Sequence, residues 1–141
     1  MIVFLDECVN KKMVSALKLI CPQHEFVIGG VDTPPGREDL PLFEEVARLG
    51  AELFVTNDVK QLFDASRQHE RAACRKCSLN WVGIPKVPAK GRLSLYAEMS
   101  YLVASLELVA RDAAAQAEPQ YYLLKAGHQD LRPVLQNHGA I

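Results

Sequence analysis

Short apolar runs separated by helix-like segments constrain this chain more than any other feature. The first run is Ile2-Val3-Phe4-Leu5, and similar runs occur at 26–28, 53–55, 81–84 and 121–124. Continuous runs rich in β-branched and aromatic residues are typical of strands buried on both faces of a parallel sheet. The segments between the runs favour helices because apolar residues recur there at helical spacing, over 10–20, 39–49, 59–73 and 95–115.

Strands that alternate with helices indicate a parallel sheet with right-handed crossovers and helices on both faces. We therefore predict an α/β fold, a three-layer α/β/α sandwich with a mainly parallel, four- to five-stranded sheet in the order 2-1-3-4-5. A further short helix is expected near 131–135. The chain has 141 residues, which fits one domain over 1–141.

Composition narrows the class of protein. Hydrophobic residues make up 49% of the chain and charged residues 23%, which excludes a disordered protein. No run of uncharged apolar residues is long enough to predict a membrane span. The apolar start lacks the basic region of a secretory signal, and four cysteines do not make a disulfide framework, so we expect reduced thiols and a cytoplasmic location.

Charge is unevenly distributed along the chain. Residues 25–66 contain nine acidic and three basic side chains, whereas residues 67–92 contain seven basic side chains and one acidic. This pattern favours two adjoining surfaces of opposite sign, or two solvated helix faces.

Acidic residues follow the first and third predicted strands. Asp6 comes directly after the first strand, Asp58 lies just beyond the third, and Asp39 begins the helix that leads into the third. Ligands of an open parallel sheet bind at the carboxyl ends of strands, where the strand order reverses. We therefore expect these three carboxylates to share one cleft, with Glu7 and Glu38 beside them.

Clustered carboxylates repel one another, and a hard divalent cation such as Mg²⁺ or Mn²⁺ relieves that repulsion. Such an ion serves the hydrolysis of a phosphodiester, and the Thr56 hydroxyl is placed to hold a water or orient a carboxylate. Plainer roles remain open at this point. Asp39 could be a helix N-cap, and Asp6 and Asp58 could be solvated strand ends or caps.

The order of these motifs resembles the PIN-like nucleases. The resemblance lies in an apolar strand ending in Asp6-Glu7, in Gly36-x-x-Asp39-Leu40 opening a helix, and in the run 53–58, Leu-Phe-Val-Thr-Asn-Asp. It covers residues 1–84 in motif and order, and the rest of the chain only in element order. The most similar types are short PIN-like proteins whose first strand ends in Asp-Glu and the VapC type of toxin ribonuclease.

The resemblance implies a Mg²⁺- or Mn²⁺-dependent endoribonuclease, the toxin of a toxin–antitoxin pair, with an antitoxin protein that blocks the cleft. It points to Asp6, Asp39 and Asp58 as the metal site, with Thr56 as the supporting hydroxyl. Standard PIN toxins carry another acidic residue in a helical insertion, where this chain has a strand and a Pro-rich turn. Glu7 or Glu38 would take its place.

RNA binding requires cations near the acidic cleft, because neutralised phosphates supply most of the non-specific affinity. The candidates are Lys11, Lys12, Arg37, Lys60 and Arg67. Trp81 or Tyr96 could stack on a base, although a tryptophan within a predicted strand is also expected in the core. RNA and an antitoxin are thus the expected partners, and a homodimer is left open.

Other interpretations compete with the nuclease. A PIN-like fold used only as a binding module needs no catalysis, and a phospho-acceptor signalling domain also has acids after its first strand and an Asp after its third. Cys74-x-x-Cys77, with His69 nearby, has the spacing of half a zinc site but no second pair. Cys8 and Cys21 are interpreted as helix-packing residues.

Overall fold

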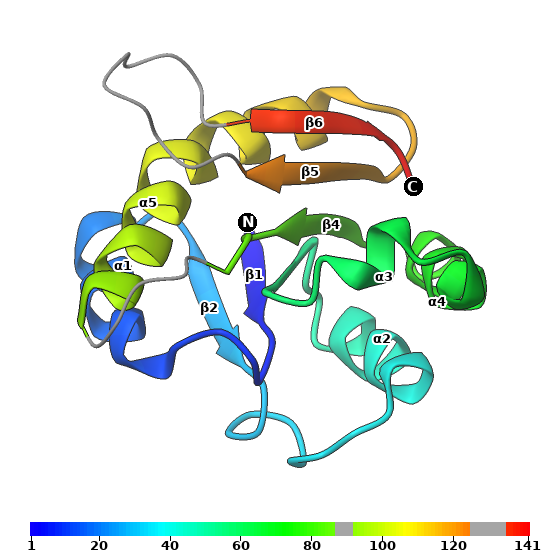
Figure 1. Ribbon diagram of the computed structural model, residues 1–141, viewed down its shortest axis with the longest axis horizontal. Helices are drawn as coiled ribbons and strands as arrows, with labels where there is room; N and C mark the ends of the chain where they lie inside the picture. The colour runs from blue at the N-terminus through cyan, green and yellow to red at the C-terminus, as the bar shows by residue number, and fades with distance from the viewer. Residues whose placement is uncertain (87–91, 125–134) are drawn as a thin grey trace.

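A mostly parallel six-stranded sheet forms the centre of the protein (Figure 1). The computed structural model describes residues 1–86, 92–124 and 135–141. The strands are β1 (Ile2–Leu5), β2 (Glu25–Ile28), β3 (Leu53–Thr56), β4 (Asn80–Gly83), β5 (Gln120–Leu124) and β6 (Leu135–Ala140), in the order β2-β1-β3-β4-β5-β6. All neighbours pair in parallel except β5 and β6, which are antiparallel.

The α/β class and the mainly parallel sheet are confirmed, but the predicted number of four to five strands was wrong. The predicted order 2-1-3-4-5 is incomplete because β6 continues it at the edge. The sequence of β6, Leu-Gln-Asn-His-Gly-Ala, contains no apolar run that would have revealed a strand. An edge strand can be held by backbone pairing on one side, so it does not need such a run.

Helices lie on both sides of the sheet, compatible with a three-layer sandwich. Figure 1 shows α1 (Val14–Ile20) and α5 (Arg92–Ala115) together on one side, and α2 (Asp39–Arg48) and α4 (Gln68–Lys76) on the other. Strand side chains alternate between two cores because they point to opposite faces. In β1, Val3 and Leu5 pack in the core with α1 and α5, whereas Phe4 packs in the core with α2 and α4.

Two helix predictions need correction. The helix expected over 59–73 is broken into α3 (Lys60–Phe63), the 3-10 turn η2 (Ala65–Arg67) and α4. The break lies at Asp64, whose extended backbone ends α3 and whose carboxylate accepts a hydrogen bond from the Ser66 N–H. The short helix expected near 131–135 falls on residues 131–134, outside the described part, and Leu135 begins β6.

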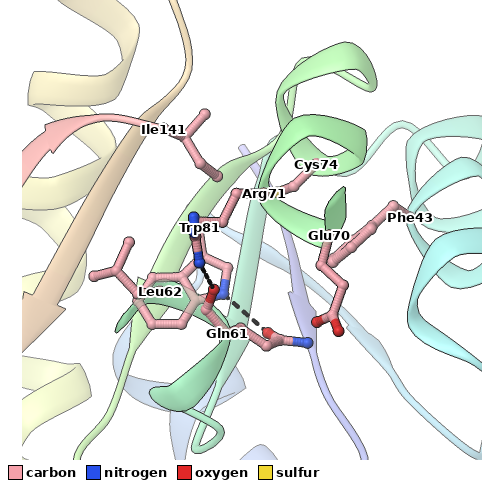
Figure 2. A pocket seen from close by; sticks show the side chains of 8 residues that line it. All are labelled: Phe43, Gln61, Leu62, Glu70, Arg71, Cys74, Trp81 and Ile141. Carbon is pink, nitrogen blue, oxygen red and sulfur yellow. Dashed lines mark hydrogen bonds between the residues drawn. The ribbon is translucent and has the colours of Figure 1, made fainter. Parts of the chain in front are cut away.

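The side chain of Trp81 belongs to the core, not to the surface. It is 3% exposed, and its indole N–H donates to Gln61 Oε1 over 3.1 Å (Figure 2). The adjacent cavity between α4 and the sheet has a volume of about 10 Å³, room for at most a water molecule. Trp81 is therefore not available to stack on a bound base.

Within the described ranges, no helix combines the length and the apolar character needed to cross a membrane.

Candidate functional site

A cleft lies at the carboxyl ends of the central strands. The strand order reverses between β1 and β3. On one side of β1 lies β2, and on its other side lie β3 and then β4. The cleft has a volume of about 750 Å³ and is lined by Cys8, Asn57, Asp58, Val59, Lys60, Arg67, Pro85 and Lys86. This is the position at which open parallel sheets bind ligands.

Thr56 connects the two strand ends that carry acidic residues. It is fully buried at the end of β3, and its hydroxyl donates to Asp6 Oδ2 over 2.7 Å. The Thr56 hydroxyl oxygen also accepts a hydrogen bond from the Asp58 N–H at 3.0 Å. The other carboxylate oxygen of Asp6 accepts from the Glu7 N–H at 2.7 Å. The Asp6 carboxylate is thus fixed from two sides, next to the loop that begins with Asp58.

Cys8 belongs to this cluster of hydrogen bonds and is not the helix-packing residue expected from the sequence. Its thiol donates to Asp6 Oδ2 over 3.1 Å, and its sulfur accepts from the Asn57 N–H at 3.2 Å. Burial of the sulfur and the charge of Asp6 raise the pKa of the Cys8 thiol to about 11. A neutral thiol is a poor nucleophile, so at neutral pH Cys8 acts as a hydrogen-bond donor.

Arg67 links the remaining acidic residues. Its Nη1 contacts Asp58 Oδ2 at 2.6 Å, and its Nη2 contacts Asp39 Oδ2 at 2.8 Å. Glu70 receives the guanidinium through two contacts, Nε to Oε1 at 2.7 Å and Nη2 to Oε2 at 2.6 Å. Glu70, and after it Asp58, raise the pKa of Arg67, which keeps the guanidinium charged.

Glu70 is the acidic residue of this group that sequence reasoning missed. It is 8% exposed, on α4, although a glutamate is seldom buried without a partner. Its spacing from Arg67, three residues along one helical segment, was the available signal, since side chains three apart face the same side.

Asp39 lies in the first turn of α2, but it is not the N-cap. That position belongs to Glu38, which is exposed and makes no capping hydrogen bond with its side chain. Burial of Asp39, followed by the nearby negative charge of Glu70, raises the pKa of the Asp39 carboxyl. The structure therefore brings Asp39 to Asp58 through the shared guanidinium of Arg67, while Glu38 lies at the surface.

Glu7 does not join the carboxylates around Arg67. Its Oε1 accepts a hydrogen bond from the Gly36 N–H at 2.8 Å, which ties the end of β1 to the Pro-rich turn before α2. Gly36 has φ of 68°, a left-handed conformation that glycine adopts without a steric penalty. The Glu7 carboxylate thus stabilises a turn.

The cations expected to contact RNA lie in different surroundings. Lys60 lines the cleft together with Lys86, which sequence reasoning did not single out. Lys12 lines a second surface depression of about 560 Å³ with Asn10, Arg92, Leu95 and Tyr96. Lys11 is exposed, and Arg37 is paired with Glu45 at 2.9 Å.

The donor set around the cleft is suited to a hard cation. Asp6, Asp39, Asp58 and Thr56 offer only oxygen atoms, which Mg²⁺ and Mn²⁺ prefer. Three carboxylates, those of Asp39, Asp58 and Glu70, contact one guanidinium, so Arg67 neutralises only part of their charge. With the side chains in these positions, no three His, Cys, Asp or Glu groups among the described residues are arranged around one ion position.

Cys74 faces the core. It is 1% exposed, its thiol donates to the Leu79 carbonyl at 3.5 Å, and burial raises its pKa. A raised pKa disfavours the thiolate that zinc requires.

Comparison with known proteins adds no assignment: no family model, curated protein or solved structure matches this chain.

Proposed function

We propose that this chain is a metal-dependent endoribonuclease with a PIN-like three-layer fold. The observation that carries the proposal is that Asp6, Asp39 and Asp58, from three separate segments, are connected at the switch point of a parallel sheet through Thr56 and Arg67. In open parallel sheets, ligands bind at the switch point, through residues that follow the carboxyl ends of the strands. RNA is the proposed substrate, and the proposed partner is an antitoxin protein that covers the cleft. The proposed location is the cytoplasm.

Asp6, Asp58 and Asp39 would hold Mg²⁺ or Mn²⁺. When bound, such an ion lowers the pKa of a coordinated water and neutralises negative charge that develops on a phosphate. The chain's own residues position the reactants. Thr56 keeps the Asp6 carboxylate in one orientation through its 2.7 Å hydrogen bond, and a fixed carboxylate binds a cation at a lower entropic cost.

Lys60 and Lys86 would attract the RNA backbone. Both line the cleft next to Asp58 and carry mobile ammonium groups that contact phosphate oxygens without reading a base. Because these contacts are electrostatic, RNA affinity should fall steeply as the salt concentration rises.

A cleavage assay tests the proposal. The purified chain is incubated with a labelled single-stranded RNA in Mn²⁺ or in EDTA, beside Asp6→Asn and Asp58→Asn. We expect cleavage that requires Mn²⁺ and falls at least about 100-fold in both variants, as losses of charge-stabilising groups generally do. Glu25→Gln is the matched control, because Glu25 is an exposed acid at the opposite, amino end of β2. Equal cleavage by all four proteins would refute the proposal.

The second candidate is a binding module without catalysis. It is favoured by the ion pairs of Arg67 with Asp39 and Asp58, which satisfy both carboxylates without a metal. Under this alternative the chain binds RNA in EDTA as tightly as in Mn²⁺, and no RNA is cleaved.

A further inference from the structure

Arg67 is a permanent cation inside a cluster of acids. Its contacts with those acids differ in kind. Glu70 holds it through one hydrogen bond, from Nε to Oε1 at 2.7 Å, and one ion contact, of Nη2 with Oε2 at 2.6 Å, and has a side chain that is only 10% exposed. Asp58 and Asp39 each contribute one bond, and their side chains are 39% and 31% exposed.

This difference divides the cluster into a fixed pair and two exchangeable ligands. An arginine–carboxylate pair that makes two close contacts and is shielded from water is costly to separate, because either charge alone would be left buried. Single contacts to partly exposed carboxylates contribute little, because water screens them. The Arg67–Glu70 pair should therefore persist when Asp58 and Asp39 turn toward another cation.

We propose that Arg67 is a positioning residue that competes with the divalent cation for Asp39 and Asp58, so that metal loading releases the guanidinium from both while Glu70 retains it. This inference rests on the proposed function. Arg67 lines the cleft beside Lys60 and Lys86, so the released Nη groups would face the substrate. A guanidinium in that position binds phosphate oxygens in a bidentate manner. Arg67 would thus hold Asp39 and Asp58 in place before the metal binds, and would contact RNA after the metal has bound.

A purely structural role is the alternative. Arg67 and Glu70 follow the break at Asp64, whereas Asp39 begins α2, so the ion pairs also join two segments of the chain. If joining them were the whole role, removing the pair would lower the melting temperature and leave the affinity for metal unchanged.

The test is the affinity for Mn²⁺, measured by calorimetry and by the electron paramagnetic resonance signal of the free ion, with no RNA present. The principal variant is the double substitution Arg67→Gln and Glu70→Gln. It removes one positive and one negative charge, so the net charge of the protein stays the same. It also avoids the buried, unpaired Glu70 that Arg67→Gln alone would leave. Lys60→Gln is the control for a cleft cation that contacts neither carboxylate in the structure.

We expect the double variant to bind Mn²⁺ about tenfold more tightly than the unaltered protein, because two partly exposed ion pairs no longer have to be broken. Its metal-free melting temperature should be lower, and Mn²⁺ should raise that temperature by more than it does in the unaltered protein. Lys60→Gln should change the affinity by less than about threefold.

Three results would overturn the inference, and the first two differ in what they imply for the proposed nuclease activity. If the unaltered protein binds Mn²⁺ and cleaves RNA while the double variant binds the ion equally or less tightly, competition by Arg67 is wrong and the proposed function stands. If neither protein binds Mn²⁺ and no metal-dependent cleavage occurs, both proposals fail. If Lys60→Gln gained as much affinity for Mn²⁺ as the double variant, the effect would come from the loss of any nearby positive charge. That result would also contradict competition by contact.

Discussion

The hydroxyl of Thr56 gives the sharpest test of the geometry at the strand ends, and Thr56→Val removes it while keeping the volume of the side chain. The hydroxyl donates to Asp6 over 2.7 Å and accepts from the Asp58 N–H at 3.0 Å, in a residue with no exposed surface. A hydrogen bond to a charged group contributes about 1.5–3 kcal/mol, and a neutral one about 1 kcal/mol. We therefore expect Thr56→Val to lower the free energy of unfolding by about 2–4 kcal/mol.

Urea denaturation followed by far-UV circular dichroism measures this loss. Thr56→Ser is the matched control, because it keeps the hydroxyl and removes one methyl group, at a cost of about 1 kcal/mol. A loss below about 1 kcal/mol in Thr56→Val would refute the two hydrogen bonds. An equal loss in both variants would show that the hydroxyl contributes no more to stability than the methyl group does. Metal-dependent cleavage should also fall in Thr56→Val more than in Thr56→Ser, since only the valine removes the hydroxyl that donates to Asp6.

Three further predictions follow from particular side chains. Burial and the charge of Glu70 raise the pKa of Asp39 above 3.8, so ionisation of Asp39 lowers the stability of the metal-free fold as pH rises from about that value. Asp39→Asn should therefore melt higher than the unaltered protein at pH 7, and the difference should shrink below pH 4; a lower melting temperature at pH 7 would contradict this sign. Burial and the charge of Asp6 raise the pKa of Cys8 to about 11, so the rate of its alkylation by iodoacetamide should rise with a midpoint near pH 11, and a midpoint at 9.0 would contradict these surroundings of the thiol. A Cβ at Gly83 would collide with the indole ring of Trp81, so Gly83→Ala should cost about 1–3 kcal/mol in urea denaturation, and an unchanged midpoint would contradict the packing.

The arrangement of the central strands was predictable because each buried strand is a continuous apolar run. β1 and β3 read as such runs, and parallel strands place whatever follows them at one edge of the sheet. The proximity of Asp6 to the segment of Asp58 follows from that rule. The rule does not extend to β6, which is polar and is held at the edge by pairing with β5 alone.

The contacts of Arg67 were not predictable from periodicity. An uninterrupted helix was expected over 59–73, whereas the break at Asp64 begins a new helical segment and sets the direction of Arg67. The role of Glu7 was also not predictable from the sequence. Two neighbouring acids after a strand look alike in sequence, but only the structure shows that the Glu7 side chain bonds to Gly36.

The central claim is that Asp6, Asp39 and Asp58 hold one divalent cation. It is tested most directly by diffraction from crystals soaked in Mn²⁺, with data collected at the manganese absorption edge. We expect an anomalous peak at the carboxyl ends of β1 and β3, within bonding distance of Asp6, Asp39 and Asp58, with Arg67 still on Glu70. A peak elsewhere, or none at saturating Mn²⁺, would contradict it.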